Sequence, residues 1–265
     1  MTVQDRIAAA ETALPMRQRV SEAEWAARVE LAALYRIIHC FGMTDLIANH
    51  ITMRVPGEQG HVLINAYGLT YDEVTASNLY KITLDGDVVL KPDLDLGLNP
   101  TGYMIHGAVH GARDDAHVVI HTHSAAGSGV SAMQCGLLPL SQHAALVEGV
   151  LGYHDYEGVA LNPEERGRLV ANLGDGNLLI LRNHGLLACG RTCGEAFIYL
   201  YRLEMACKIQ VAAMAGGLEN ASAMSQAALD NTRAIALANP GLVGGELQWK
   251  ALLRRMDRID PSFRE

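Results

Sequence analysis

His117-Val118-Val119-Ile120-His121-Thr122-His123 is the segment around which the rest of this sequence is organised. Its apolar run predicts a buried strand, and the side chains of a strand alternate between the two faces of a sheet. His121 and His123 should therefore point to the same side at the end of the strand, where two imidazoles can hold a divalent metal ion. The alternative is that both are buried histidines bonded to backbone groups.

A third candidate ligand follows a second apolar run, Leu178-Leu179-Ile180-Leu181-Arg182-Asn183-His184-Gly185. His184 lies just beyond this run and before a glycine, so it too is expected at the end of a strand. Three histidines at strand ends, His121, His123 and His184, predict an open metal site with a position left for water or substrate. Arg182 and Asn183 flank the third histidine and are expected to orient it through hydrogen bonds.

The composition argues against several classes of protein. With 265 residues, 49% of them hydrophobic, the chain can form one large domain or two small ones. A net charge of -8 argues against a nucleic-acid partner, and no apolar run reaches the roughly 18–20 residues of a membrane span. The N-terminal stretch has no long apolar core and is not expected to be a secretory signal. Five cysteines without a paired CxxC spacing indicate reduced thiols in a cytoplasmic protein.

Periodicity and capping signals predict one α/β domain over residues 21–265, preceded by an N-terminal arm over residues 1–20. Capping boxes at Ser21 and Glu24, and at Thr192 and Glu195, mark the starts of two long helices. The expected strands are residues 50–55, 61–65, 80–84, 88–90, 117–123, 178–182 and 186–189. The expected helices are residues 21–42, 100–113, 124–134 and 192–215, with a helical, peripheral tail from residue 222. This order favours a mixed, mostly antiparallel sheet.

Four motifs together give the sequence a resemblance to the class II aldolase/adducin family over residues 22–215. They are Asn49-His50-Ile51-Thr52-Met53-Arg54-Val55, Ile64-Asn65-Ala66-Tyr67-Gly68-Leu69, Val118-Val119-Ile120-His121-Thr122-His123-Ser124 and Leu181-Arg182-Asn183-His184-Gly185-Leu186. Residues 73–77, 131–139 and 153–156 are similar to the adducin head and its bacterial relatives rather than to the sugar-phosphate aldolases. The resemblance implies a three-layer α/β/α sandwich and a cyclic homotetramer. It also implies a divalent metal, usually zinc with manganese or iron as alternatives, on His121, His123 and His184.

One position departs from the aldolases in a way that affects the expected chemistry. The aldolases carry a Glu as proton carrier on the segment that precedes the histidine strand, and the shared His106 places Gly102 at that position. A general acid–base group is typically worth about 10²–10⁴ in rate, so aldolase turnover by the family mechanism is not expected. His106 and Tyr103 remain the candidate catalytic residues of this segment. His106 is equally compatible with a packed helix histidine that bonds a carbonyl.

A second departure affects the expected ligand. The aldolases bind phosphate with a Gly-Asn pair and a Ser-Gly loop, and these positions read Asn49-His50 and Tyr67-Gly68 here. Two rings replace the hydroxyl donor and the glycine that allows close approach, so a sugar phosphate is not expected. His50, Arg54, Tyr67 and Gly68 are the candidate contacts of a small-molecule carboxylate.

Three functions fit these features. The first is a divalent-metal-dependent lyase, aldolase-like or a decarboxylase, acting on a small non-phosphorylated oxo-, hydroxy- or aromatic carboxylic acid through a metal-stabilised enolate. The second is a catalytically impaired, metal-binding module for binding or assembly, as the adducin head is. The third is a non-haem iron oxygenase, because imidazole ligands alone do not select the metal.

Overall fold

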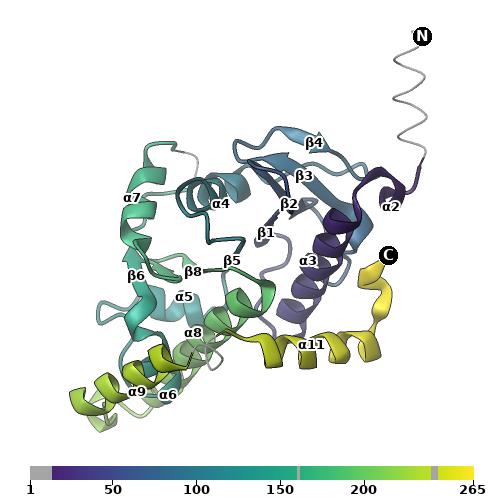
Figure 1. The fold of residues 1–265 in the computed structure, drawn as a ribbon. Coiled ribbons are helices and arrows are strands. Elements are labelled where there is room, and N and C mark those ends of the chain that lie inside the picture. Colours follow the sequence, from purple (N-terminus) through teal and green to yellow (C-terminus); the bar gives the residue numbers. More distant parts are fainter. Residues whose placement is uncertain (1–13, 160–161, 240–243) are drawn as a thin grey trace.

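A computed structural model describes residues 14–159, 162–239 and 244–265. Of the predicted N-terminal arm, residues 1–13 lie outside the described residues. The described part of the arm contains the short helix α2 (Met16–Arg19), which lies at the upper right in Figure 1. None of the described helices is long and apolar enough to cross a membrane.

An eight-stranded sheet forms the centre of the described chain, in the order β4-β3-β2-β1-β5-β8-β7-β6. Only β6 and β7 pair in parallel, and the other neighbours are antiparallel. The prediction of a mixed, mostly antiparallel sheet is confirmed. The strands are β1 (His50–Arg54), β2 (His61–Asn65), β3 (Leu79–Thr83), β4 (Val88–Leu90), β5 (Val118–Thr122), β6 (Leu151–His154), β7 (Leu178–Leu181) and β8 (Gly185–Gly190).

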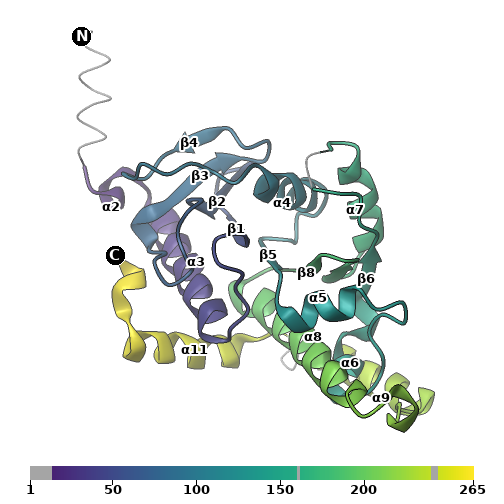
Figure 2. The same ribbon diagram turned by 180° about the vertical axis from the view of Figure 1, so that it is seen from behind.

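Helices cover both faces of this sheet, as Figures 1 and 2 show from opposite sides. Alternation along β5 explains the two layers: Val118 and Ile120 join a core with α3, α8 and α11, whereas Val119 joins a core with α4 and α7. The predicted three-layer α/β/α sandwich is therefore confirmed. The helices are α3 (Glu22–Cys40), α4 (Pro100–Ala112), α5 (Ala125–Ser131), α6 (Gln142–Val147), α7 (Glu165–Leu173), α8 (Cys193–Met214), α9 (Gln226–Ala238) and α11 (Glu246–Ile259).

The two predicted capping boxes form only in part. Ser21 accepts a hydrogen bond from the Glu24 amide at the start of α3, as expected, but the Glu24 carboxylate pairs with Arg28. Thr192 likewise caps α8 by accepting from the Glu195 amide. In α3 the hydroxyl alone caps the backbone, because the Glu24 carboxylate pairs with the buried Arg28 instead. In α8 the Glu195 carboxylate accepts from the Arg191 amide, one residue before the cap, and from the Arg191 guanidinium.

The C-terminal tail is not peripheral throughout, which corrects the expectation from its polar sequence. Helix α11 packs against α3 and α8, and it buries Trp249 and Met256. Phe263, just beyond it, is fully buried, and Arg36 of α3 pairs with Asp260 at 2.7 Å. A few apolar residues at helical spacing bury this segment, although its other positions are polar. Helix α9 lies with α6 at the lower end of the molecule in Figure 1.

Candidate metal centre

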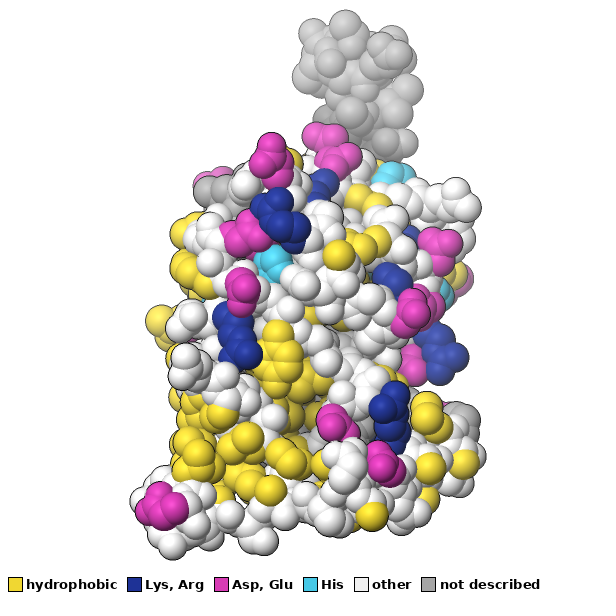
Figure 3. Space-filling view, turned by 90° about the vertical axis from the view of Figure 1, so that its left-hand side faces the viewer, with side chains coloured by type: hydrophobic (Ala, Val, Ile, Leu, Met, Phe, Trp, Pro, Cys, Tyr) yellow, Lys and Arg dark blue, Asp and Glu magenta, His cyan; other side chains and the backbone are white. Residues whose placement is uncertain are grey.

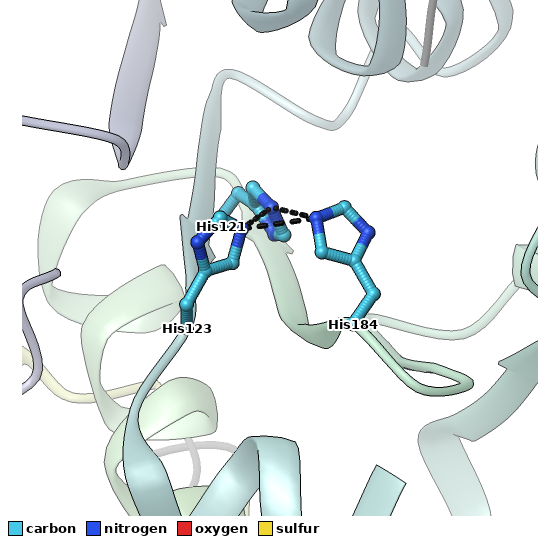
Figure 4. A group of neighbouring side chains, drawn as sticks. All are labelled: His121, His123 and His184. Atoms are coloured by element: carbon cyan, nitrogen blue, oxygen red, sulfur yellow. Dashed lines mark hydrogen bonds between the residues drawn. The ribbon is translucent and has the colours of Figure 1, made fainter. Parts of the chain in front are cut away.

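The three predicted ligands meet where strands end in the middle of the sheet, at the end of β5 and in the turn before β8, as Figure 4 shows. His121 belongs to β5, His123 follows that strand directly, and His184 lies in the turn between β7 and β8. Their Nε2 atoms are separated by 2.8 Å (His121 to His123), 2.9 Å (His123 to His184) and 3.2 Å (His121 to His184). Strand pairing brings them together, since β5 and β8 are hydrogen-bonded neighbours.

The hydrogen bonds of the rings show which nitrogen carries the proton. His121 Nδ1 lies 3.0 Å from the Leu186 carbonyl oxygen, and His123 Nδ1 lies 3.1 Å from the Asp45 carboxylate. Both partners can only accept, so each Nδ1 donates and each Nε2 of a neutral ring keeps a bare lone pair. These lone pairs face each other at 2.8 Å and repel unless a cation lies between them. The arrangement therefore fits a metal ion, with Leu186 and Asp45 orienting the ligands.

Burial keeps His121 and His184 in the form that binds metal. Desolvation lowers the pKa of His121 well below its ordinary value, and it lowers the pKa of His184 to about 4. Neutral imidazole is the ligand form of histidine, so at neutral pH these rings are ready to donate their lone pairs. The three histidines form a group whose ligand atoms all lie within 4.8 Å of one another.

A turn with one left-handed residue presents the third histidine. Asn183 adopts a left-handed backbone conformation with φ +56°, and its amide donates to the Ser131 carbonyl. Ser128 Oγ donates to the His184 carbonyl at 2.9 Å. Arg182 donates to the Met133 carbonyl and lies over the Tyr153 ring. Arg182 and Asn183 thus hold the turn through backbone groups, whereas the sequence suggested hydrogen bonds that orient the His184 ring.

A cavity of about 580 Å³ opens beside the cluster. Its polar lining includes Asp45, Asn99, Thr101, Ser128 and Asn183. Tyr67, Tyr156 and Val159 also line it, and all three are exposed, so the cavity has an apolar mouth. Among the described residues, no Lys or Arg lines this cavity. A bound cation would therefore be the main positive charge that this part of the chain offers to an anionic ligand.

The structure brings two of the four predicted substrate contacts to the cavity. His50 and Tyr67 line it, but Arg54 and Gly68 do not. His50 and Arg54 lie on the same face of β1, but four residues of a strand span roughly 13 Å. The Arg54 guanidinium instead donates to the carbonyls of His110 and Arg113 at the C-terminal end of α4. Gly68 lies against the Leu96 side chain at a left-handed φ of +116°.

The two candidate catalytic residues do not line the cavity either. His106 is fully buried on α4, and it lies behind His50, with Nε2 3.0 Å from His50 Nδ1. Tyr103 points elsewhere, because its ring packs against the β3–β4 turn at Gly86. Both lie on the predicted helix, but only His106 shares the helix face of Gly102.

Gly102 lies in the first turn of α4 and faces His50. A Cβ atom at this position would lie 3.1 Å from His50 Cδ2 and 3.3 Å from Ile64 Cδ1. The space beside the three histidines that a side chain at position 102 would enter is therefore filled by the His50 ring. The sequence indicated that the glutamate is absent, but it did not indicate that His50 occupies the space of its side chain.

Comparison with known proteins identifies the family of this chain. The family model of the Class II Aldolase and Adducin N-terminal domain matches residues 29–211. This chain belongs to that family. Among class II aldolase relatives, a Caulobacter vibrioides protein with the provisional name aldolase class 2 protein is 48% identical over 257 residues, covering 96% of this chain and 99% of the relative. Rat α-adducin is 49% identical over 196 residues, covering 73% of this chain but 26% of that protein.

Solved structures of the class II aldolase family agree with this assignment. The crystal structure of an aldolase II superfamily protein from Pseudomonas syringae has a TM-score of 0.90 at 45% identity, covering 94% of this chain and 99% of that one. An L-fuculose 1-phosphate aldolase from Glaciozyma antarctica has a TM-score of 0.78 at 24% identity, covering 97% and 99%. The second likeness shows a shared fold.

Several residues of this site were not predicted from the sequence. Asp45, which bonds a metal-cluster histidine, lies in a loop without any motif. Asn99 and Thr101 line the cavity at the start of α4, where the helix was predicted. Thr52 and His110 contact each other behind the cavity. His110 follows His106 by one helical turn, so helical spacing alone could have paired these two histidines.

Proposed function

We propose that this chain is a divalent-metal-dependent lyase acting on a small, non-phosphorylated carboxylic acid. The observation that carries the proposal is the convergence of the three imidazole Nε2 atoms of His121, His123 and His184 beside an open cavity. Three imidazoles with an open position suit zinc, and manganese or iron are the alternatives. The metal would supply Lewis-acid catalysis by withdrawing electrons from a carbonyl or carboxylate beside the breaking C–C bond.

The lining of the cavity favours a carboxylate over a phosphate. Among the described residues the lining contains no Lys or Arg, so the anionic group of the ligand would have to meet the metal itself. The N-terminus of α4 also borders the cavity, but Asn99 Oδ1 already accepts from the Thr101 amide and hydroxyl there. Pro100 has no amide hydrogen to offer at the first helical position. A phosphate would have to displace this cap to bind the helix end.

The mouth of the cavity suits an apolar or aromatic body on that acid. Tyr67, Tyr156 and Val159 are 42%, 53% and 67% exposed, and the Tyr156 ring centroid lies 6.1 Å from that of His184. A substrate whose carboxylate lies at the metal would place its other end among these side chains. Loss of carbon dioxide from such an acid needs no base to remove a hydroxyl proton first, which agrees with Gly102 in place of a glutamate.

We also propose a homo-oligomer, a tetramer as in the family resemblance, that works in the cytoplasm. The apolar surface supports this proposal. In Figure 3, hydrophobic side chains gather on the lower part of the face that bears β6 and α9, whereas charged groups lie mostly above them. On α9, Ile235 and Leu237 are 47% and 73% exposed. A contiguous apolar area of this kind is typical of a protein interface.

A second candidate is a metal-binding module for binding or assembly without turnover. The similarity to rat α-adducin favours it, as does the missing glutamate. The chain spans about a quarter of the length of that relative. This candidate function therefore does not include the binding partners of the whole adducin.

Metal analysis followed by a substrate screen tests the proposal. Protein purified without an affinity tag should carry about one zinc, manganese or iron ion per chain. The metal-loaded protein should release carbon dioxide or an aldehyde from an oxo-, hydroxy- or aromatic carboxylic acid, and His184→Ala should lose both metal and turnover. His61→Ala is the matched control, because His61 lies on β2 and pairs with Glu58 away from the cluster. Metal binding without turnover of any such acid would favour the binding module, and iron with oxygen consumption would favour an oxygenase.

A further inference from the structure

We propose that His50 presents a fixed, unprotonated Nε2 atom to the cavity, where it accepts a hydrogen bond from the substrate. It would thereby select acids that carry a hydroxyl next to the carboxylate over the corresponding oxo acids. This inference rests on the proposed function, because it assumes that a small acid binds at the three-histidine cluster. It names the subclass of acid, which the cluster alone does not specify.

A line of hydrogen bonds behind the cavity fixes the orientation of the His50 proton. The line runs from the Ala116 carbonyl to His110 Nδ1 (2.8 Å), from His110 Nε2 to Thr52 Oγ1 (2.7 Å), and from Thr52 Oγ1 to His106 Nδ1 (2.7 Å). His106 Nε2 then lies 3.0 Å from His50 Nδ1. Each side chain in the line is buried, so no water competes for these contacts.

The direction of every bond in this line follows from its first member. A carbonyl can only accept, so His110 Nδ1 donates to Ala116 and His110 Nε2 accepts the Thr52 hydroxyl proton. The Thr52 oxygen has no second proton, so His106 Nδ1 donates to it and His106 Nε2 accepts. His50 Nδ1 must then donate to His106, which leaves His50 Nε2 without a proton.

This argument holds for neutral rings, and burial keeps them neutral. Desolvation lowers the pKa of His110 to about 3 and the pKa of His106 well below its ordinary value, and the His50 side chain is buried beside them. A neutral imidazole has one donor and one acceptor, so the line has a single consistent arrangement of protons.

His50 is placed to contact a substrate bound at the three-histidine cluster, but it does not itself belong to the group that could coordinate the metal. It lies directly opposite His121 in the β1–β5 pairing, on the same face of the sheet, with ring centroids 5.3 Å apart. It lines the cavity, but it is outside the group whose ligand atoms lie within 4.8 Å of one another. Among the described residues, none donates a hydrogen bond to His50 Nε2. Because Gly102 has no side chain, the His50 ring can occupy this space.

A bare imidazole nitrogen distinguishes a hydroxyl from a carbonyl. A 2-hydroxy acid can place one donor toward His50 Nε2, whereas a 2-oxo acid of the same skeleton would oppose an oxygen lone pair to a nitrogen lone pair. Both acids can chelate a metal through the same two oxygens, so the metal does not itself make this distinction. One hydrogen bond in a partly desolvated site is worth about tenfold in relative affinity.

The tautomer of His50 is the first test, and it needs neither metal nor substrate. Long-range ¹H–¹⁵N correlation spectra of the metal-free, ¹⁵N-histidine-labelled chain at pH 7.5 report which nitrogen of each ring carries the proton. We expect His50, His106 and His110 all to be protonated on Nδ1, with the His50 signal identified by its loss in His50→Asn. Thr52→Val, which keeps the shape of the strand residue but removes the hydroxyl, should shift His50 toward a mixture of tautomers. A His50 ring protonated on Nε2 in the unmodified protein would overturn the proposal.

Ligand discrimination is the second test. Calorimetric titration of the zinc-loaded protein with lactate and pyruvate, and with mandelate and benzoylformate, gives the preference for hydroxy over oxo acid. We expect His50→Asn, whose amide can still donate to His106, to reduce this preference about tenfold. Thr52→Val should reduce it in part, and the control His61→Asn should leave it unchanged. Zinc affinity, measured by chelator competition, should change by less than about threefold in His50→Asn, because His50 is not a ligand.

The two tests separate the inference from the proposed function. An unchanged preference in His50→Asn would overturn the role of His50 even if every acid binds. A zinc-loaded protein that binds none of the four acids would instead contradict the proposed function. The tautomer spectra would still decide whether His50 Nε2 is bare.

Discussion

The ring of His50 occupies the space that a side chain at position 102 would need: a Cβ atom on Gly102 would lie 3.1 Å from His50 Cδ2. The two residues come from different elements, β1 and α4, and each is a departure from the aldolase sequences that the chain resembles. Their contact makes the two departures one structural feature. A glutamate at position 102 and a histidine at position 50 cannot both take these positions without a shift of the helix or the ring.

Gly102→Ala should destabilise the protein even though alanine favours helices. At an open helical site the change from glycine to alanine stabilises by about 0.5–1 kcal/mol. At position 102 the methyl group meets the His50 ring and Ile64, so we expect a net loss of about 1 kcal/mol or more. Urea unfolding of the metal-free protein measures this difference.

Gly111→Ala is the matched control for this prediction. Gly111 lies on the same helix, is exposed, and would place its methyl group where no atom lies within 4 Å. It should stabilise the protein by the usual fraction of a kcal/mol. The combination of His50→Ala with Gly102→Ala should be less damaging than the sum of the two single changes. Additive effects would show that the contact between residues 50 and 102 is not under strain.

Asp45 should support metal binding without touching the metal. Its carboxylate accepts from His123 Nδ1 at 3.1 Å and so fixes the ring with Nε2 toward the cluster. Loss of such a partner typically costs about 10–100-fold in metal affinity, which we expect for Asp45→Ala. His123→Ala should lose more, because it removes a ligand. Competition with a chromogenic zinc chelator measures both, with Asp72→Ala as the control, since Asp72 pairs with His39 away from the cluster. Equal affinities for Asp45→Ala and the unmodified protein would contradict the role of Asp45.

Asn183 should tolerate glycine better than alanine. Its left-handed φ of +56° suits glycine and asparagine, but for other residues the conformation costs about 1–2 kcal/mol. We therefore expect Asn183→Ala to lower the free energy of unfolding by about 1 kcal/mol and to weaken zinc binding, because the turn presents His184. Asn183→Gly should change the free energy of unfolding by a few tenths of a kcal/mol. If both substitutions cost the same, the asparagine side chain rather than its backbone conformation holds the turn.

The metal-free protein should lose stability in mild acid. The pKa of His110 falls from about 6.5 in an unfolded chain to about 3 in the folded protein, because the ring is buried. Between these values the unfolded state binds a proton that the folded state does not. Stability is therefore fully present above pH 6.5, and it falls by about 1.4 kcal/mol per pH unit for this histidine as the pH decreases. Urea unfolding at pH 7.5, 6.5 and 5.5 measures the slope.

A variant isolates the share of His110 in this acid sensitivity. His110→Asn can still accept the Thr52 hydroxyl proton through its side-chain oxygen, but it cannot titrate. Between pH 6.5 and 5.5 the free energy of unfolding of this variant should depend less steeply on pH. The difference in slope from the unmodified protein should correspond to about one proton taken up on unfolding. The buried histidines away from this line, such as His121, are common to both proteins. An unchanged slope would mean that His110 accepts a proton in the folded state.

Local patterns in the sequence determined most of the secondary structure and the membership of the three-histidine cluster. The alternation in 117–123 defines a strand with two imidazoles on one face, and the run before His184 places a third at a neighbouring strand end. These predictions depend on distances along one segment, which the period of a strand or helix specifies. The hydroxyl caps at Ser21 and Thr192 were predictable for the same reason, since donor and acceptor lie three residues apart.

Only the tertiary structure decided what surrounds the cluster. Arg54 shares a strand face with His50, but its guanidinium donates to carbonyls at the C-terminal end of α4, because the helix ends there and not at the cavity. The partners of His50, which are Gly102, His106 and Thr52, depend on how α4 packs across β1. Side-chain contacts between separate elements depend on packing and burial, and no period along the chain encodes them. The sequence by itself thus determined which residues could bind a metal, and the packing of helix on sheet decided which of them meet and in which protonation state.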